Sequence, residues 1–264
     1  MNLLAIDSAA DILSVALSCG DEIFYAQAAE GMRQSELVMD LIDSLFKKAS
    51  LEPCDLNGVL CMGGPGSFTG LRIGYSVAKG LALSLSIPFA AIPTLDCIAY
   101  QRTKNKEQRI ENREQSTMNK EQRIENNEQR TEKCEPLSNS QLLLAVIQAR
   151  KNAWFYAFFR GEERLTPDRD ADSIQISGEL NKFREQIILT GPGSALLYES
   201  FPEETKNRII IMEENKGYAG EIINIAKKRN IQDNDYVAYL YSGPEYIRKT
   251  DAELNLEEKA GVYL

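Results

Sequence analysis

The sequence contains no histidine at all. This absence excludes Ser-His-Asp and Cys-His catalysis, zincin-type motifs and any metal site that needs an imidazole ligand. The sequence also has no C-x-x-C pair, because its cysteines are scattered. An odd, unpatterned set of cysteines is typical of reduced thiols in the cytosol, so we expect a cytoplasmic location. The five cysteines are Cys19, Cys54, Cys61, Cys97 and Cys134.

The sequence has fewer basic residues than acidic ones, 30 compared with 39, which gives a net charge of −9 and a pI near 4.9. A protein that grips nucleic acid by its phosphates usually carries a basic face, so direct binding of nucleic acid is not the expected main activity. No apolar run approaches the roughly 20 residues that a membrane helix needs, and we expect no membrane association.

A glycine-rich segment at 63–72 follows the apolar run Val59–Met62 and opens a helical pattern at Leu71–Ser86. Glycine reaches positive φ, and the N–H groups at the start of a helix face any bound anion, so the segment could cradle a phosphate. It could equally be a tight turn that lets a helix lie close to a sheet, and both interpretations stay open here. The candidate residues for a cradle are Gly64, Gly66, Ser67 and Thr69.

The helix that follows has one nearly bare face, because Gly70, Gly74, Ala78 and Ala82 recur every four residues. Glycine inside a helix costs about 1 kcal/mol relative to alanine, so two on one stripe indicate that another backbone approaches closely. The approaching element could be a sheet or a helix across an interface. An earlier helix is predicted at Gln34–Ala49, whose wide apolar stripe indicates either burial within the chain or contact with another protein.

The rest of the chain alternates between predicted strands and helices. A meander of three strands precedes any helix, and after residue 140 the chain begins again with a pair of strands. The early strands are predicted at Leu3–Ser8, Leu13–Cys19 and Ile23–Ala28. The later elements are strands at Gln141–Gln148, Ala153–Phe159, Ile187–Thr190 and Ile209–Met212, with helices at Ser177–Glu185 and Tyr218–Arg229.

A polar repeat separates the two halves. The 11 residues Asn105–Gln115 recur at Asn119–Gln129 with one change, within a highly charged stretch at Arg102–Lys133. Such a stretch buries too little apolar surface to offset its ordering entropy, so we expect a disordered or solvated helical insertion. The predicted organisation is an N-terminal lobe at 1–101, an insertion at 102–134 and a C-terminal lobe at 135–264, with the first helix of the tail packing back on the N-terminal lobe.

Two features of the first half return in the second half in the same order. The run Leu3–Asp7 is answered by Leu144–Gln148, and Gly64–Ser67 is answered by Gly191–Ser194. The sequence therefore predicts two duplicated α/β lobes, as in the actin, sugar-kinase and Hsp70 class of ATPases. There, acidic turns from both lobes hold the metal of Mg-ATP, whereas Gln148 here is neutral and only Asp7 is acidic. The cleft candidates in these turns are Asp7, Ser8 and Gly193.

The run Leu4–Ser8 and the segment Gly63–Gly74 together resemble the bacterial TsaB family, also called YeaZ. The resemblance covers the first hundred residues closely, is weaker over Leu142–Phe159 and returns at Pro244–Arg248. It implies an actin-like ATPase (ribonuclease H-like) fold with two lobes, each a mixed sheet flanked by helices, that has lost its active site. It implies neither cofactor nor metal.

The resemblance also implies a non-catalytic subunit that binds and stabilises TsaD, which installs the threonylcarbamoyl group on adenosine 37 of ANN-decoding tRNAs. TsaE would join a larger complex, tRNA would be contacted only indirectly, and the protein alone could form a homodimer. In the family, two helices pack on the partner, and here they match Gln34–Ala49 and Leu71–Ser86. The implied interface residues are Leu37, Val38, Leu41, Ile42, Leu45, Arg72, Gly74, Tyr75, Ala78 and Ala82.

Three features depart from the family pattern. The first helix opens with Arg33-Gln34-Ser35-Glu36 where relatives often have histidine, Gln148 stands where relatives often have aspartate, and the repeat is an addition. Two other functions remain as alternatives. One is an ATPase or small-molecule kinase that uses Asp7, Ser8 and the glycine turns. The other is a peptidase, for which only a Ser-Lys or carboxylate mechanism is left.

Overall fold

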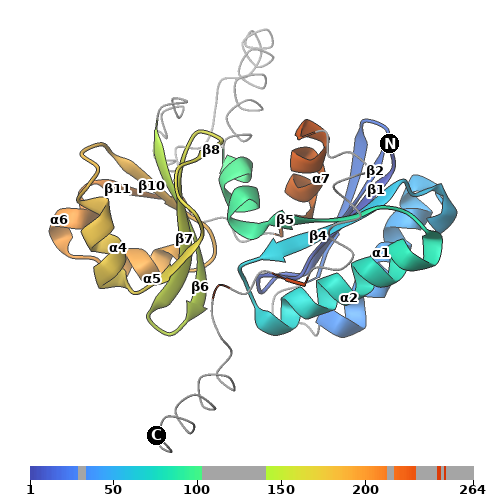
Figure 1. The fold of residues 1–264 in the computed structure, drawn as a ribbon, viewed down its shortest axis with the longest axis horizontal. Coiled ribbons are helices and arrows are strands. Elements are labelled where there is room, and N and C mark those ends of the chain that lie inside the picture. Colours follow the sequence, from blue (N-terminus) through green and yellow to red (C-terminus); the bar gives the residue numbers. More distant parts are fainter. Residues whose placement is uncertain (29–33, 103–140, 213–216, 230–242, 245–246, 248–264) are drawn as a thin grey trace, which may run out of the picture.

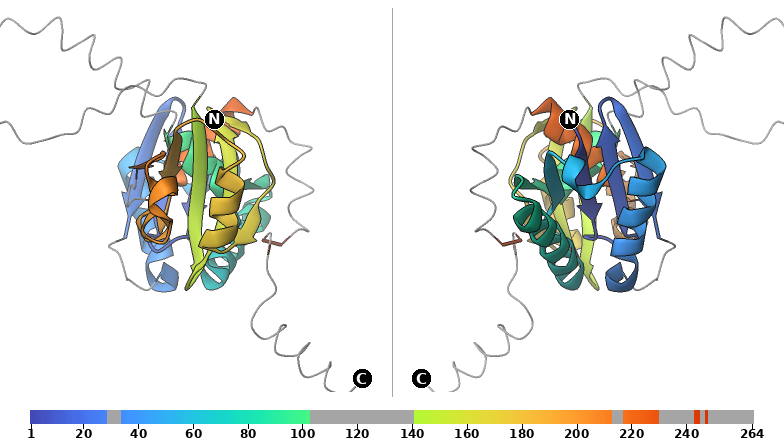
Figure 2. Two further views of the ribbon diagram at one scale, coloured as in Figure 1. Left: turned by 90° about the vertical axis from the view of Figure 1, so that its left-hand side faces the viewer. Right: turned by 90° about the vertical axis from the view of Figure 1, so that its right-hand side faces the viewer.

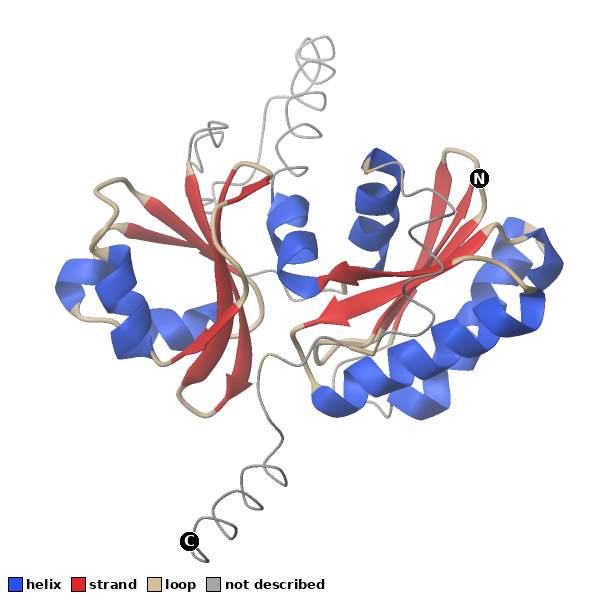
Figure 3. Ribbon diagram, in the orientation of Figure 1, coloured by secondary structure: helices blue, strands red, loops and turns tan. Residues whose placement is uncertain are grey.

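The computed structural model describes residues 1–28, 34–102, 141–212, 217–229, 243–244 and 247. The insertion predicted at 102–134 lies outside this part of the chain except for Arg102. Most of Pro244–Arg248 lies outside it as well. The described elements form two lobes, each built on one mixed sheet with helices on its faces (Figures 1 and 3). The predicted α/β fold of two duplicated lobes is therefore confirmed.

The first sheet has the strand order β3-β2-β1-β4-β5. The meander pairs are antiparallel, and β1 pairs with β4, and β4 with β5, in parallel. β1 and β4 are buried along almost their whole length, which explains their nearly continuous apolar runs. The strands are β1 (Leu3–Asp7), β2 (Ser14–Cys19), β3 (Glu22–Gln27), β4 (Gly58–Gly64) and β5 (Phe89–Pro93).

The second sheet has the order β11-β10-β6-β7-β8, with β9 also paired to β7. Read from its other edge, this order repeats that of the first sheet, with two antiparallel pairings followed by two parallel ones. The echo in the sequence thus marks equivalent strands of two lobes. The strands are β6 (Leu142–Arg150), β7 (Ala153–Arg160), β8 (Glu163–Arg164), β9 (Arg169–Ala171), β10 (Ile187–Thr190) and β11 (Ile209–Met212).

Helices cover the outer face of each sheet (Figures 1 and 2). α1 (Gln34–Ala49) and α2 (Phe68–Leu85) bury their apolar side chains with those of β1, β2 and β4. In the second lobe, α4 begins at Ser173 and not at the predicted Ser177, because Asp172 caps it by accepting a hydrogen bond from the Gln175 N–H. The remaining outer helices are α4 (Ser173–Leu180), α5 (Ser194–Glu199) and α6 (Glu203–Lys206), and a 3₁₀ turn lies at Pro53–Asp55.

Two helices lie between the sheets, one at residues 94–102 and the other α7 (Ala219–Lys228). One cluster of buried apolar side chains joins these helices to the inner faces of both sheets. Alternation along β6 shows how the strands serve two cores: Leu143, Ala145 and Ile147 face this central cluster, and Leu142 and Leu144 face the outer one. α7 follows the last strand of the second sheet, yet it packs on the first sheet.

None of the helices in the described ranges combines the length and the apolar character needed to cross a membrane.

Candidate functional site

The glycine turn between β4 and α2 is filled by the chain's own backbone. A Cβ atom at Gly66 would lie 2.6 Å from the Ala9 carbonyl oxygen, and one at Gly70 would lie 1.8 Å from the Ser8 carbonyl oxygen. The Ser67 N–H donates to the Ala9 carbonyl over 2.8 Å, and the Ser8 hydroxyl donates to the Gly70 carbonyl over 2.7 Å. The glycines therefore let α2 press against the turn after β1.

This contact favours the tight turn over the phosphate cradle, the two interpretations of the segment that the sequence left open. Ser67 is the N-cap of α2, and its hydroxyl accepts from the Gly70 N–H over 3.2 Å. That donor would otherwise face an anion. Gly64 is buried with a φ of 107°, whereas the side chain of Thr69 is exposed. The arrangement is that of a turn packed against the sheet.

Asp7 ends β1 and is completely buried. One carboxylate oxygen accepts from the Ala9 N–H over 3.1 Å, and the other accepts from the Tyr218 N–H over 2.7 Å, at the start of α7. Burial raises the pKa of Asp7 from 3.8 to about 6, and the two backbone N–H groups limit that rise. Each carboxylate oxygen of Asp7 thus already accepts a hydrogen bond from the chain's own backbone.

The equivalent turn of the second lobe is closed in a similar way. A Cβ at Gly193, where φ is 85°, would lie 2.8 Å from the Gln148 Cβ. The indole N–H of Trp154 donates to the Gly193 carbonyl over 3.2 Å, and the Gln148 N–H donates to the Pro192 carbonyl over 3.0 Å. Gly193 therefore packs on β6 and β7.

The element that approaches the bare face of α2 is the sheet of the first lobe, to which α2 itself belongs. Gly74 would place a Cβ 2.6 Å from the Ser8 hydroxyl oxygen, and Ala78 and Ala82 are fully buried in the outer core of this lobe. The residues named from the family resemblance divide accordingly. Arg72 is exposed, Leu37 and Leu41 are half-buried, and the others are covered within the chain. These covered residues are Val38, Ile42, Leu45, Gly74, Tyr75, Ala78 and Ala82.

A different stripe of α2 remains open, which the sequence did not reveal. Ile73, Val77 and Leu81 are only partly buried, Gly80 is exposed, and a Cβ at Gly80 would meet nothing within 4 Å. Positions 73, 77, 80 and 84 fall on one helical face, so the i, i+4, i+7 spacing could have revealed this stripe. In the sequence, Gly80 of this stripe cannot be distinguished from Gly70 and Gly74 of the buried face.

No group of three or more Cys, Asp or Glu side chains that could hold a metal ion gathers in the part of the chain that the structure describes.

The sequence comparisons find proteins named TsaD and TsaB. A family model described as TsaD, tRNA N6-adenosine threonylcarbamoyltransferase, matches residues 31–111, which include α1 and α2. The tRNA threonylcarbamoyladenosine biosynthesis protein TsaB of Bacillus subtilis (strain 168) is 37% identical over 101 residues, or 38% of this chain and 44% of that protein. In this match and two further TsaB matches, the chain spans about half of the relative's length.

One relative aligns over most of its length. TsaB of Buchnera aphidicola subsp. Acyrthosiphon pisum (strain APS) is 24% identical over 222 residues, which cover 82% of this chain and 96% of that protein. Among solved structures, a Pseudomonas aeruginosa protein described as similar to peptidase YeaZ matches with a TM-score of 0.66 and 16% identity, over 94% of this chain and 99% of that one. YeaZ from the same organism gives a TM-score of 0.63 at 16% identity, over 87% and 93%. This likeness shows that the chain shares the fold of these two solved structures.

Proposed function

With the TsaB (YeaZ) family supported by both the sequence and the structure matches, we propose that this chain is a non-catalytic subunit of the system that makes threonylcarbamoyladenosine in tRNA. In this proposal it binds TsaD and stabilises it, so that TsaD installs the threonylcarbamoyl group on adenosine 37 of ANN-decoding tRNAs. TsaE joins the larger complex, and tRNA is contacted only through it. The protein alone can pair with a second copy.

The filled cleft turns are the observation that carries the non-catalytic role. Phosphoryl transfer needs carboxylates for Mg²⁺ and free backbone N–H groups for the phosphates. In this chain both oxygens of Asp7 accept backbone hydrogen bonds, and the Gly70 N–H is taken by Ser67. The residues that an ATPase or kinase would use are thus engaged in holding the lobe together.

We place the TsaD-binding surface on the outward side of α1 and α2. Each helix offers half-buried apolar side chains beside exposed ones, Leu37 and Leu41 on α1 and Ile73 and Val77 on α2. Partly buried apolar stripes on two neighbouring helices are the kind of surface that packs against helices of a partner. The exposed glycine of α2, Gly80, would let a partner backbone come close to this surface.

The experiment is to replace Gly80 with leucine and to measure binding of TsaD. Because a Cβ at Gly80 meets open space, the variant should fold and gain helix propensity of up to about 1 kcal/mol. The bulky side chain should weaken binding by at least about tenfold, since overpacking a fitted contact typically costs 1–3 kcal/mol. Co-purification and calorimetry with TsaD measure the effect.

Gly178→Leu is the matched control, because Gly178 is an exposed helical glycine of α4 with equally open space around it. It should leave TsaD binding unchanged. Equal binding by the parent and both variants would remove α2 from the interface. If the parent chain itself neither binds TsaD nor supports the modification, the proposed function fails as a whole. Tight binding of Mg-ATP by the isolated chain would instead favour an ATPase.

A further inference from the structure

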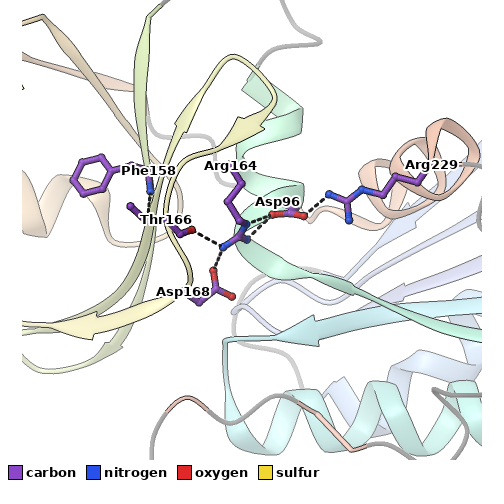
Figure 4. Close-up of polar contacts among 6 residues, drawn as sticks. All are labelled: Asp96, Phe158, Arg164, Thr166, Asp168 and Arg229. Atoms are coloured by element: carbon purple, nitrogen blue, oxygen red, sulfur yellow. Dashed lines mark hydrogen bonds and ion pairs between the residues drawn. The ribbon is translucent and has the colours of Figure 1, made fainter. Parts of the chain in front are cut away.

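Asp96 lies where three separate parts of the chain meet (Figure 4). It belongs to the helix at 94–102, which follows the last strand of the first sheet. Its Oδ1 atom accepts from the Nε of Arg164 over 2.8 Å and also from Nη2 of the same guanidinium. Its Oδ2 atom accepts from Arg229, the residue at the C-terminal end of α7. One carboxylate thus joins the first lobe, β8 of the second lobe and α7.

The charges at this junction are balanced and mostly covered. The side chains of Asp96 and Asp168 are each 9% exposed and that of Arg164 is 27% exposed. Arg164 pairs with Asp168 through its remaining Nη1 atom, and its guanidinium lies 4.9 Å from the centre of the Phe159 ring. A guanidinium held in a fork by two carboxylates has one favoured orientation, so this group fixes direction as well as distance.

α7 is fastened to the first lobe at its other end as well. The Tyr218 N–H donates to the buried Asp7, and the Ala219 N–H donates to the Ser14 hydroxyl over 3.1 Å. Asp7 and Asp96 therefore hold opposite ends of one helix. Because Arg164 comes from the second lobe, Asp96 alone of these two carboxylates also ties that lobe to the helix.

A cavity of about 280 Å³ opens beside this junction. Its lining combines apolar side chains, Phe159 and Ile225 among them, with four charged ones. The charged side chains already form pairs, Lys228 with Glu162 and Arg229 with Asp96. Each of these four charged side chains is therefore paired with another that lines the cavity.

We propose that Asp96, with Arg164 and Arg229, forms an ionic latch that sets the angle between the two lobes. A duplicated two-lobed fold has a hinge between its lobes, and packed elements there can slide or rotate unless something fixes them. A covered carboxylate bound by guanidinium groups from two other elements favours one geometry over alternatives, because any rotation leaves a desolvated charge unpaired. The latch holds the lobes in the arrangement described above.

The experiment compares Asp96→Asn and Arg164→Gln with Glu185→Gln in the full chain. Glu185→Gln is the matched control, because its pair with Arg160 lies within the second lobe. Spin labels at Cys54, an exposed cysteine of the first lobe, and at Ile174→Cys, a position 80% exposed in the second lobe, report the distance between lobes. The other accessible cysteines are replaced by serine.

Both latch variants should broaden the distribution of distances between the labels, and the control should keep it narrow. Amide hydrogens of the helix at 94–102 and of α7 should exchange at least about tenfold faster in the latch variants, as breaking a buried ion pair loosens its neighbours. If Asp96→Asn does not fold, the proposal is tested with Arg164→Gln and with Arg229→Gln, whose side chain is more exposed. A narrow distribution in every folded latch variant, or the same broadening in the control, would overturn the proposal.

Discussion

Asp7 combines two properties that usually exclude one another, complete burial and an acidic side chain. Its environment is a compromise, because burial disfavours the charge and the N–H groups of Ala9 and Tyr218 favour it. Burial is the larger effect, so the pKa of Asp7 rises to about 6 in the folded protein. This residue looked from the sequence like the acid of a nucleotide cleft, and the structure gives it a place in the interior.

The raised pKa predicts a specific dependence of stability on pH. The folded state binds a proton at Asp7 more tightly than the unfolded state does, so the free energy of unfolding should fall as the pH rises from 3.8 to about 6. Above the pKa of the folded state the loss is complete, and a shift of about two pKa units corresponds to about 3 kcal/mol. Urea unfolding between pH 4 and pH 8 measures it.

Asp7→Asn provides the reference curve, because its amide keeps the same charge at every pH. The parent should lose stability relative to this variant as the pH rises, whatever the other carboxylates contribute to both curves. Parallel curves would mean that Asp7 titrates in the folded protein as it does in the unfolded chain.

Alanine substitutions at Gly70 and Gly80, two glycines of the same helix, should have opposite effects on stability. A methyl group at Gly70 would overlap the Ser8 carbonyl oxygen, whereas one at Gly80 meets open space. Gly70→Ala should therefore destabilise the protein by about 1–3 kcal/mol or more, through forced backbone shifts. Gly80→Ala should stabilise the protein by up to about 1 kcal/mol, because alanine lowers the conformational entropy of the unfolded chain. Denaturant midpoints compare the two variants, and equal effects would be inconsistent with the close contact at Gly70.

At the scale of secondary-structure elements, the sequence located most helices and strands well. Apolar periodicity predicts Gln34–Ala49, which is the full extent of α1. α4 was misplaced because its N-terminal signal is the polar cap Asp172, not its apolar spacing. The two faces of α2 could not be told apart, because small residues mark both a contact with a sheet and an open surface. The two faces of α2 are distinguished only by the structure, in which Ser8 and Ala9 lie against one of them.

The packing of α7 in the core between the sheets should contribute to the stability of the whole chain. Ile222 is fully buried and belongs to the cluster of apolar side chains between the sheets. Ile222→Ala should cost about 2–5 kcal/mol, because the methyl groups removed leave a cavity in a packed interior. Ile174→Ala on the exposed surface of α4 should change stability by less than about 0.5 kcal/mol. Thermal unfolding measures both, and a small effect at Ile222 would show that α7 is loosely packed.

For the molecule as a whole, the repeated glycine turns and strand pairs were enough to predict a duplicated fold. The two sheets share their strand order, so the echo at Gly64–Ser67 and Gly191–Ser194 reflects equivalent positions. The sequence did not reveal how the lobes join. Asp96, Arg164 and Arg229 are far apart along the chain, and no local pattern links a charged residue to a partner 68 or 133 residues away.

The bond between Asp7 and the Tyr218 N–H joins residues 211 positions apart, and this separation bears on how the protein is made. The first lobe emerges from the ribosome long before α7, so during synthesis its inner face lacks the helix that covers it and Asp7 lacks one of its donors. Contacts of such long range form late and slow folding. The N-terminal lobe should therefore reach its final structure only when nearly the whole chain has been synthesised, and until then its apolar inner face is open to chaperones or to aggregation.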